Sequence, residues 1–259
     1  MAEKIKICSF NLRCETSRDG INQFSLGRCD RVIELIRNES PDVIGFQEMT
    51  PSMYAFMRDS LPEYSFFGCG RNKDYSGEST AIAVKNKGFS VISYDTFWLS
   101  FTPSVPGSTF GADQSNCPRT ATSLLIHRDG SDECFRAVNT HLDHIGERAR
   151  ILGIAEIIQY ISKFPEKFVL TGDFNATPDS SVIAALNGTE HFCRPVRELT
   201  ENVDGTFHGY GKLEAPIKID YIFSDADFEP SESKLVAYPP VNGVYVSDHH
   251  PVFATVVIN

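Results

Sequence analysis

The chain has 259 residues, of which 41% are hydrophobic and 22% are charged, and both values lie near the averages of globular proteins. This length suits one large layered domain over residues 1–259, and no stretch is biased enough in composition to indicate disorder. The N-terminal segment has no signal-type apolar core, and no apolar run reaches membrane-spanning length. We therefore expect one folded domain without membrane insertion.

Cysteine usage indicates the cellular compartment, and net charge bears on whether the protein binds long nucleic acid. Seven cysteines, an odd number without CxxC spacing, run from Cys8 to Cys193 and suit a reducing compartment better than a disulfide framework. The sequence therefore predicts a cytoplasmic protein, and we expect a monomer. The net charge of −10 argues against a protein that coats long nucleic acid, because neutralising many phosphates requires a basic surface.

The first elements can be read from their periodicity. Residues 4–10 alternate polar and apolar side chains, which predicts a strand with one buried face. Apolar residues at helical spacing predict a helix over residues 28–38, and Pro41 marks its exit. The apolar run 43–46 then predicts a buried strand that ends at Glu48.

The middle of the chain is typical of strands separated by Gly, Pro, Asn and Asp turns. Such strands are expected at residues 81–84, 91–98, 121–126 and 135–139. The segment from Phe101 to Pro118 is expected to be a long irregular loop. An apolar stripe over residues 147–162 predicts a second helix that packs on a sheet.

The last part of the chain also combines short strands with a helix. A short buried strand is expected at residues 168–170 and a helix at 179–186. Further strands are expected at residues 217–223, near 235–238 and at 252–258. The order of elements predicts an α/β fold in which two packed mixed sheets carry helices on their outer faces.

Polar residues collect where the predicted strands stop, which is where α/β proteins place their sites. A single strand-end Asp or Asn is more often a turn former or a helix cap than a catalyst. Six such places together form a far more specific pattern. They are Ser9-Phe10-Asn11, Gln47-Glu48, Asn139-Thr140-His141, Gly172-Asp173-Phe174-Asn175, Ile219-Asp220-Tyr221 and Ser247-Asp248-His249-His250-Pro251.

These residues in this order resemble the endonuclease/exonuclease/phosphatase superfamily, which includes deoxyribonuclease I, exonuclease III, apurinic endonucleases, sphingomyelinases and inositol-polyphosphate 5-phosphatases. The resemblance covers nearly the whole chain and implies a four-layered α/β sandwich of the deoxyribonuclease I-like type. Further segments of the chain resemble the compact branch of this superfamily, which includes the carbon-catabolite-repressor-type deadenylases and nocturnin. These matches are Gly70-Arg71 through Gly77-Glu78, Trp98-Leu99-Ser100 through Pro106-Gly107-Ser108, Arg119, and Thr206-Phe207-His208-Gly209.

The residue types suit hydrolysis of a phosphate ester by water, which requires charge neutralisation, a positioned nucleophile and stabilisation of the leaving oxygen. Glu48 is a hard oxygen ligand of the kind that magnesium or manganese prefers. The resemblance implies that Asn11 helps to hold this metal or the phosphate, and that Asp248 completes the metal site. Taken alone, Glu48 would be interpreted as a solvated strand-end carboxylate.

The spacing of Asp173 and Asn175 puts both side chains on one side of an extended chain and directs Phe174 into the core. One of the two polar side chains can then orient water while the other holds a phosphate oxygen. The alternative is an Asx-turn followed by a helix N-cap before Pro178.

Two histidines stand at strand ends, where an imidazole can donate to phosphate or exchange a proton near neutral pH. They are His141 and His249, and we assign His249 to proton handling or transition-state stabilisation. A catalytic histidine usually needs a third group that fixes its tautomer. The resemblance implies Asp220 as this group for His249 and Glu78 for His141.

Substrate contacts are expected from side chains within or beside the motifs. Four are predicted to bind the phosphate ester: Asn11, Arg71, Arg119 and His208. Lys73 and Arg148 lie near the same motifs and can also hold a phosphate.

The other candidate side chains have structural interpretations. His144, like His208, can reach the rim of the site, although a hydrogen-bonded loop position suits both. His127, His191 and His250 are expected to be structural. Trp98 can stack a base, but a lone Trp within a strand is more often part of the core.

Other hydrolytic chemistries lack their motifs. The sequence has no Gly-x-Ser-x-Gly elbow, no P-loop, no His-Glu-x-x-His pair and no cysteine in a phosphatase-like loop with Arg. A covalent intermediate is therefore disfavoured. Two classes of function remain: an active hydrolase, and a catalytically dead binding or scaffold protein that keeps the fold. The complete set of site residues favours the hydrolase.

The substrate stays open among nucleic acid, nucleotides, inositol phosphates and lipid headgroups, as does endo- versus exonuclease action. The acidic net charge and the lack of a Lys/Arg run favour a terminal phosphodiester, such as the 3' end of single-stranded nucleic acid, over a long duplex. We expect a 3'-exonuclease-like enzyme. The alternative is a phosphatase or phosphodiesterase of a small molecule or lipid headgroup.

Overall fold

Two six-stranded sheets form the centre of the computed structural model, which describes residues 4–111, 113–187, 196–225 and 229–257. The first sheet has the order β11-β12-β1-β2-β4-β3. Its strands are β1 (Lys4–Asn11), β2 (Val43–Gln47), β3 (Tyr64–Phe67), β4 (Ile82–Lys85), β11 (Glu229–Leu235) and β12 (Val252–Val257). Strand β1 pairs parallel with β2 and antiparallel with β12, so the two ends of the chain meet in this sheet.

The second sheet has the order β5-β6-β7-β8-β10-β9. Its strands are β5 (Phe89–Trp98), β6 (Thr120–Arg128), β7 (Cys134–His141), β8 (Lys167–Asp173), β9 (Val196–Glu198) and β10 (Asp220–Asp225). Strands β7 and β8 are parallel, and the other neighbouring pairs are antiparallel. Both sheets are therefore mixed, as the sequence predicted.

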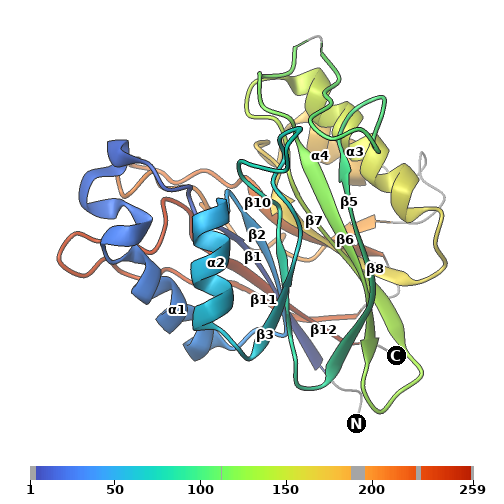
Figure 1. Cartoon of the computed structure of the whole chain (residues 1–259), viewed down its shortest axis with the longest axis horizontal. Coiled ribbons are helices and arrows are strands. Elements are labelled where there is room, and N and C mark those ends of the chain that lie inside the picture. Colours follow the sequence, from blue (N-terminus) through green and yellow to red (C-terminus); the bar gives the residue numbers. More distant parts are fainter. Residues whose placement is uncertain (1–3, 112, 188–195, 226–228, 258–259) are drawn as a thin grey trace.

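Helices cover the outer face of each sheet and complete four layers (Figure 1). Helices α1 (Arg28–Glu39) and α2 (Pro51–Ser60) pack on the first sheet, and α3 (Glu147–Ile161) and α4 (Ser181–Asn187) pack on the second. Two short 3-10 helices, η1 (Ser17–Asn22) and η2 (Phe24–Leu26), precede α1. Three apolar clusters fill the three interfaces between the layers. The predicted α/β sandwich is confirmed.

Strand β1 shows how this packing positions polar groups. It is buried on both faces, not on one as its alternation predicted. Cys8 and Phe10 pack toward the helices, whereas Ile7 faces the other sheet. Because successive side chains alternate between faces, the inter-sheet face continues from Ile7 into Ser9 and Asn11. One face of the strand is therefore apolar at its start and polar at its end.

Strands β8 and β10 repeat this pattern. Val169 belongs to the inter-sheet core, and Asp173 ends β8 on the same face. Strand β10 begins with Asp220 and continues with Ile222 in the inter-sheet core. In the sheet register Asp173 lies opposite Asp220 on one side and beside His141 on the other. The polar strand ends therefore meet at one edge of the sandwich.

The two sheets approach closely at Gly45, just below these polar ends. A Cβ at this position would lie 2.1 Å from Thr171 Oγ1 and 2.6 Å from Asn139 Oδ1, so only glycine fits. The Asn139 amide then joins the sheets, because its Nδ2 donates to the Phe46 carbonyl at 2.7 Å and its Oδ1 accepts from Gln47 Nε2 at 2.6 Å. This bridge supports the polar edge from within.

The predicted elements 28–38, 43–46, 81–84 and 147–162 correspond to α1, β2, β4 and α3, while one α-helix and two short strands were missed, in addition to the 3-10 helices η1 and η2. The missed α-helix and strands are α2, β3 and β9. Helix α2 carries a local signal, because the Thr50 hydroxyl accepts from the Met53 N–H and Pro51 follows at the first helical position. Strands β3 and β9 have 4 and 3 residues, too few to show a period.

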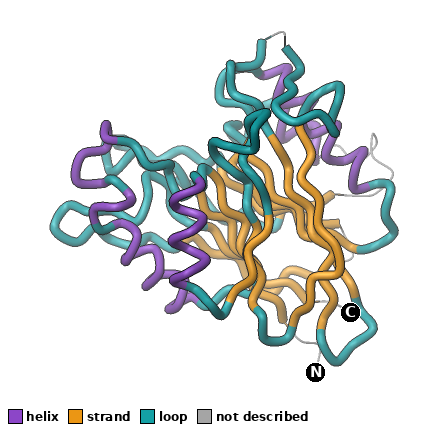
Figure 2. Tube along the Cα trace, in the orientation of Figure 1, coloured by secondary structure: helices purple, strands orange, loops and turns teal. Residues whose placement is uncertain are grey.

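The strand predicted near 235–238 is wrong in position, because β11 ends at Leu235. Its sequence EPSESKL is mostly polar, as suits an edge strand, and shows little apolar periodicity. The segment from Phe101 to Pro118 contains no helix or strand among its described residues, as predicted (Figure 2). Trp98 is a core residue, 3% exposed, whose indole N–H donates to the Arg71 carbonyl at 2.6 Å.

Two observations concern membrane spans and cysteine pairing. Within the described part of the chain, no helix is long and apolar enough to cross a membrane. The six described cysteines are unpaired, and Cys193 lies outside the described residues.

Candidate active site

The polar strand ends enclose a cavity of about 360 Å³, which we call the phosphate pocket. Side chains from segments far apart in the sequence line it: Arg13, Glu48, Arg71, Glu78, Arg119, His141, His144, Asp173, Asn175, Asp248 and His249. Two other predicted residues, Asn11 and Asp220, are buried behind this lining and hold it in place.

His249 is held as a buried cation. Its ring is 4% exposed, with Nδ1 2.8 Å from Asp220 Oδ2 and Nε2 3.9 Å from Asp173 Oδ2. Burial opposes protonation, but the charges of Asp220, Asp248 and Asp173 outweigh it and raise the pKa of His249 to about 10. Asp220 thus contacts the histidine for which the sequence predicted it.

The raised pKa of Asp173 favours its neutral form, whereas that of His249 favours its charged form. Its carboxyl is 2% exposed, and its Oδ2 accepts from Asn11 Nδ2 at 2.9 Å. Burial and the nearby charge of Asp220 raise the pKa of Asp173 to about 7. A carboxyl with this pKa can exchange a proton near neutral pH.

Asn175 follows Asp173 in a sharp turn, not in an extended chain as predicted. Its φ is 47°, and its backbone N–H donates to Asp173 Oδ1 at 2.9 Å. This bond is the Asx-turn that stood as the alternative, yet both side chains still line the phosphate pocket. Phe174 is buried in the core as predicted. The Asx-turn and a role in the site are therefore not alternatives, because the turn places both side chains in the pocket lining.

Glu48 and Asp248 form a carboxylate pair on another wall of the pocket. Glu48 Oε2 accepts from the Cys14 N–H at 2.9 Å, and its Oε1 lies 3.3 Å from Asn11 Nδ2. The Arg13 guanidinium lies 3.8 Å from each carboxylate. Burial raises the pKa of Asp248, so a further cation would stabilise its charged form. Together with the Asn11 amide oxygen, this donor set fits a hard divalent ion.

Three side chains could also surround an ion from a different side. Ligand atoms of Asp173, Asp220 and His249 lie within 4.8 Å of one another. The His249–Asp220 hydrogen bond already occupies one nitrogen and one oxygen of this group. We therefore interpret the group as a proton-handling cluster and favour the Glu48 and Asp248 carboxylates for an ion.

Two arginines form the basic wall. Arg71 makes a two-point ion pair with Glu78, with Nη1–Oε2 at 2.8 Å and Nη2–Oε1 at 3.0 Å. Arg119 lies with Nε 3.6 Å from Asp143 Oδ2, and its Nη2 donates to His144 Nδ1 at 2.8 Å. His144 therefore reaches the rim of the pocket through Arg119.

The geometry corrects the partner predicted for His141. Glu78 is engaged by Arg71, and His141 Nδ1 has no hydrogen-bond partner in the described part of the chain. His141 Nε2 lies instead 3.5 Å from Asp173 Oδ2. The prediction that Glu78 fixes His141 is wrong, because a guanidinium beside a carboxylate forms the stronger charge-assisted pair.

Several buried polar atoms of the pocket lack a partner among the described residues. They are Arg119 Nε and Nη1, His141 Nδ1 and Asp220 Oδ1. Burial and the positive charge of Arg119 lower the pKa of His141 well below its usual value, so the ring is neutral. A buried polar group without a partner costs about 1–3 kcal/mol. Two unpartnered guanidinium N–H groups beside a neutral imidazole form a site that an anion such as phosphate would satisfy.

His208 does not line the phosphate pocket, so the structure gives no support to its predicted substrate contact. Its Nδ1 accepts from the Gly211 N–H at 3.1 Å, and its ring stacks on His250 at 4.1 Å. Burial lowers the pKa of His208 to about 4. The tight loop after Phe207 turns the ring toward His250, which is the loop position considered as its alternative.

The remaining described candidates do not line the pocket. Lys73 and Arg148 are not among its lining residues. His127 Nε2 lies 2.8 Å from the Ser131 carbonyl, in keeping with its structural interpretation. His191 lies outside the described residues.

Sequence reasoning missed two charged residues of the pocket and its support, Arg13 and Asp143. Asp143 is 2% exposed and accepts from the backbone N–H groups of Ser115, Ile145 and Gly146. Each missed residue follows a strand-end motif by two positions, after Asn11 and after His141. This spacing was the available signal, but charged residues after a strand are more often solvated turn residues.

The backbone is strained at the pocket. Arg13, Glu48 and Asn175 have φ values of 55°, 58° and 47°, in the left-handed region that non-glycine residues seldom adopt. All three side chains line the phosphate pocket. Such strain costs of order 1–3 kcal/mol per residue and is typical of functional sites.

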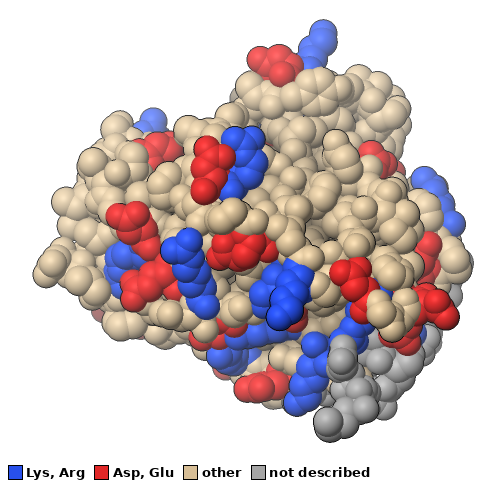
Figure 3. Space-filling model, turned by 60° about the horizontal axis from the view of Figure 1, so that its bottom comes forward, with Lys and Arg blue, Asp and Glu red and all other residues tan. Residues whose placement is uncertain are grey.

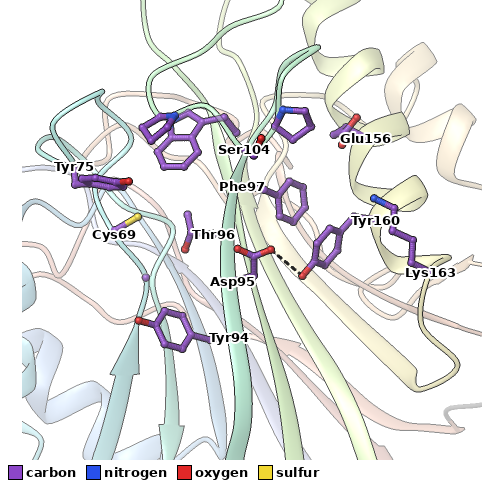
Figure 4. A pocket seen from close by; sticks show the side chains of 14 residues that line it. Cys69, Tyr75, Tyr94, Asp95, Thr96, Phe97, Ser104, Glu156, Tyr160 and Lys163 are labelled. Carbon is purple, nitrogen blue, oxygen red and sulfur yellow. Dashed lines mark hydrogen bonds between the residues drawn. The ribbon is translucent and has the colours of Figure 1, made fainter.

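A second and larger cavity of about 890 Å³ lies beside the edge strand β5 (Figure 4). We call it the aromatic groove, and its lining includes Tyr75, Tyr94, Asp95, Trp98, Glu156 and Tyr160. The Tyr94 and Tyr75 rings are 62% and 55% exposed, and the Tyr160 hydroxyl donates to Asp95 at 3.3 Å. The groove shares no lining residue with the phosphate pocket.

The charged surface gives no sign of a long nucleic-acid track on the face drawn in Figure 3. On this face Lys and Arg side chains alternate with Asp and Glu side chains. Neutralising a long phosphate backbone requires a continuous basic surface.

Comparison with known proteins agrees with this geometry. The model of the endonuclease/exonuclease/phosphatase family matches residues 8–249, which spans five of the six strand-end motifs and the sixth as far as His249. The chain belongs to this family. A family structure from Bacteroides vulgatus is 29% identical, covers 99% of this chain and 100% of its own, and superposes with a TM-score of 0.91.

Two further solved structures share the fold. The mannosyl-6-phosphatase of Bacteroides thetaiotaomicron is 24% identical, with a TM-score of 0.87 and 98% and 100% of the two chains covered. The catalytic domain of human nocturnin is 16% identical, with a TM-score of 0.73 and 99% and 95% covered. The similarity to nocturnin that the sequence predicted is therefore present at the level of the fold.

Proposed function

We propose that this chain is a divalent-metal-dependent phosphoester hydrolase that cleaves its substrate by direct attack of water. The observation that supports this most strongly is the convergence of Asp173, Asn175, His141 and His249 with a carboxylate pair and basic side chains in one pocket of about 360 Å³. No serine lines this pocket, and its two cysteines, Cys14 and Cys117, stand in no phosphatase-like loop with Arg. Burial raises the pKa of the Cys14 thiol, which disfavours the nucleophilic thiolate, so the proposal has no covalent intermediate.

Glu48, Asp248 and the Asn11 amide would hold Mg²⁺ or Mn²⁺ in this proposal. When bound, the ion would neutralise charge on the phosphate and so favour attack by an oxygen nucleophile. The strained backbone of Glu48 and its hydrogen bond from Cys14 hold this carboxylate toward the pocket.

The protein side chains would divide the remaining work. Asp173, with its pKa raised to about 7, orients the water and takes its proton. His141 and Asn175 hold phosphate oxygens, and the His249 cation stabilises the charge that develops on the leaving oxygen. Asp220 keeps the His249 ring in place through their 2.8 Å hydrogen bond.

Two substrate classes fit this chemistry. The first is a terminal phosphodiester, such as the 3' end of single-stranded nucleic acid, as expected from the acidic charge of the chain. The second is a small phosphate ester, which the pocket volume of about 360 Å³ favours because it is at the small end of ligand sites. We further propose a cytoplasmic monomer, which fractionation and light scattering would test.

The test is a hydrolysis screen in magnesium or manganese. It compares single-stranded RNA and DNA, duplex DNA, nucleotides, inositol phosphates, sugar phosphates and sphingomyelin as substrates. Release of phosphate or of a cleaved product from at least one substrate supports the proposal, with Asp173→Asn as the inactive control. A purified folded protein that binds one of these substrates but hydrolyses none would instead support the scaffold alternative.

A further inference from the structure

Three arginines line the phosphate pocket, and each is held by a carboxylate outside the proposed metal-binding pair. Arg71 pairs with Glu78 at 2.8 Å, and Arg119 lies 3.6 Å from Asp143. The third is Arg13, whose Nε and Nη2 donate to Asp19 at 3.0 and 3.3 Å. This pairing fixes three guanidinium groups around one small cavity.

Arg13 is held at its backbone as well as at its guanidinium. Its N–H donates to Asn11 Oδ1 at 2.9 Å, and its carbonyl accepts from Nη2 of the fully buried Arg28 at 2.9 Å. Asp19 is itself held by the Tyr210 hydroxyl at 3.1 Å. None of these contacts uses Nη1, the inner edge of the guanidinium, which faces Glu48 of the pocket lining.

That inner edge still has hydrogen-bonding capacity. Arg13 has five N–H donors, two of which donate to Asp19. Its Nη1 lies 3.8 Å from Glu48 Oε2, too far for a hydrogen bond. The side chain is 30% exposed and lines the pocket. An incoming oxyanion can therefore accept from Nη1 without breaking the contact with Asp19.

We propose that Arg13 makes the phosphate pocket selective for a terminal phosphate monoester over an internal diester. This inference rests on the proposed hydrolase function and names its substrate class. Arg119 and Arg71 would hold one side of the phosphate, and Arg13 would hold the third terminal oxygen beside the metal-binding carboxylates.

The difference between the two esters lies at this third oxygen. A monoester phosphate has three terminal oxygens and carries about −1.5 to −2 charges at neutral pH. A diester has two terminal oxygens and one charge, and its second ester group takes the place of the third oxygen. Arg13 would then face an esterified oxygen, which is a weaker acceptor than a charged one.

The reaction balances without a further reactant. Water forms a new P–O bond as its proton passes to Asp173, and the ester P–O bond breaks with its electron pair on the leaving oxygen. That oxygen leaves as an alcohol or phenol when it takes up a proton from solvent, Asp173 returns its proton to solvent, and the other product is inorganic phosphate. A neutral sugar phosphate and a terminally phosphorylated oligonucleotide both present this chemistry.

The experiment compares two substrates with the same leaving group, p-nitrophenyl phosphate and bis(p-nitrophenyl) phosphate, in manganese. The wild type is expected to show the higher kcat/KM with the monoester. Arg13→Gln should reduce monoester kcat/KM by roughly 10- to 100-fold, as expected for loss of charge-assisted hydrogen bonds. Diester kcat/KM should change by less than about threefold, because Arg13 contacts no charged oxygen of a diester.

Matched variants separate this role from a structural one. Arg148→Gln removes an exposed arginine outside the pocket and should leave both rates unchanged. Arg13→Lys keeps the charge without the planar fork and should recover only part of the monoester rate. Inorganic phosphate should raise the melting temperature of the wild type more than that of Arg13→Gln, a readout independent of turnover.

Each other outcome has a defined meaning. Equal losses for both esters in Arg13→Gln, or a wild type that prefers the diester, would overturn the inference while leaving the hydrolase proposal intact. A wild type that hydrolyses neither of these two esters nor any substrate of the screen would overturn the proposed function itself. Glucose 6-phosphate and a 3'-phosphorylated oligonucleotide, assayed in parallel, distinguish the two sources of a monoester.

Discussion

The phosphate pocket and the aromatic groove are both hollows of the same surface, but they are built on different principles. The groove has the larger volume, about 890 Å³ against 360 Å³, and two of its tyrosines, Tyr75 and Tyr94, are exposed. The pocket concentrates buried charges, among them Asp173 at 2% and His249 at 4% exposure. Burying charges is costly unless they are paired or act on a ligand. The comparison teaches that electrostatic cost, and not volume, identifies the reactive site.

The backbone differs between the regions as well. Arg13, Glu48 and Asn175 of the pocket all lie in the left-handed region, whereas Tyr75 is the only described non-glycine residue of the groove lining there. The pocket also contains the unpartnered donors of Arg119. Strain and unpartnered groups lower stability, so their concentration in one place favours a functional reason for keeping them.

Metal removal should have the largest effect and should act on the pocket alone. Excess EDTA should abolish hydrolysis, because oxygen ligands such as Glu48 and Asp248 release hard cations to chelators. Manganese should raise the melting temperature of the wild type and of the groove variant Glu156→Gln, but not that of Glu48→Gln. Full activity in EDTA would contradict this prediction.

Removal of a proton-handling residue should come next. His249→Ala, Asp173→Ala and Asn175→Ala should each lower kcat by roughly a hundredfold or more, because these groups act on the transition state. Circular dichroism should show a folded protein in each case. A near-normal rate for His249→Ala would remove that residue from the mechanism.

The close approach of the sheets below the pocket should appear as a stability effect. Gly45→Ala would put a Cβ 2.1 Å from Thr171 Oγ1, so we expect a loss of about 1–3 kcal/mol in the free energy of unfolding. Gly88→Ala is the matched control for added bulk, because nothing lies within 4 Å of a Cβ there, although its positive φ adds strain of its own. A larger loss in Gly88→Ala than in Gly45→Ala would contradict close packing at the sheet interface.

Asp143 should give the pocket wall a pH dependence in the acid range. Hydrogen bonds from Gly146 and Ser115 overcome its burial and lower the pKa of Asp143 to about 2. A carboxyl with a lowered pKa stabilises the fold above its unfolded pKa near 4, and this stabilisation is lost as the pH falls toward 2. Its size is roughly 1–2 kcal/mol. Urea titrations at pH 6 and pH 3 should show a smaller acid loss for Asp143→Asn than for the wild type.

The smallest effect is expected in the groove. Tyr94 is 62% exposed, so Tyr94→Ala should change the free energy of unfolding by less than about 0.5 kcal/mol. Hydrolysis of p-nitrophenyl phosphate should stay within about twofold of the wild type, because the groove shares no lining residue with the phosphate pocket. A tenfold loss with this small substrate would show that the two regions are coupled and would break the comparison.

The sequence by itself determined the layers and most of the site. Helices α1 and α3 and strands β1, β2, β4, β7 and β8 have periods long enough or runs apolar enough to read directly. Asp173 and Glu48 were found because they stand where such strands end, and His249 because it precedes the last strand, β12. The start of β12 lies beside the end of β1, because these two strands are antiparallel. Local pattern is sufficient here because the side-chain direction in a strand depends only on its period of two.

Only the tertiary structure decided which charged groups face each other. Glu78 pairs with Arg71 and not with His141, and His208 turns away from the pocket onto His250. Arg13 enters the pocket because the buried Arg28 and Asp19 hold its backbone and side chain. These partners are set by loop paths and by distances of 2.8 to 3.8 Å between segments remote in the chain. Electrostatic interactions depend on such distances, and no periodicity in the sequence encodes them.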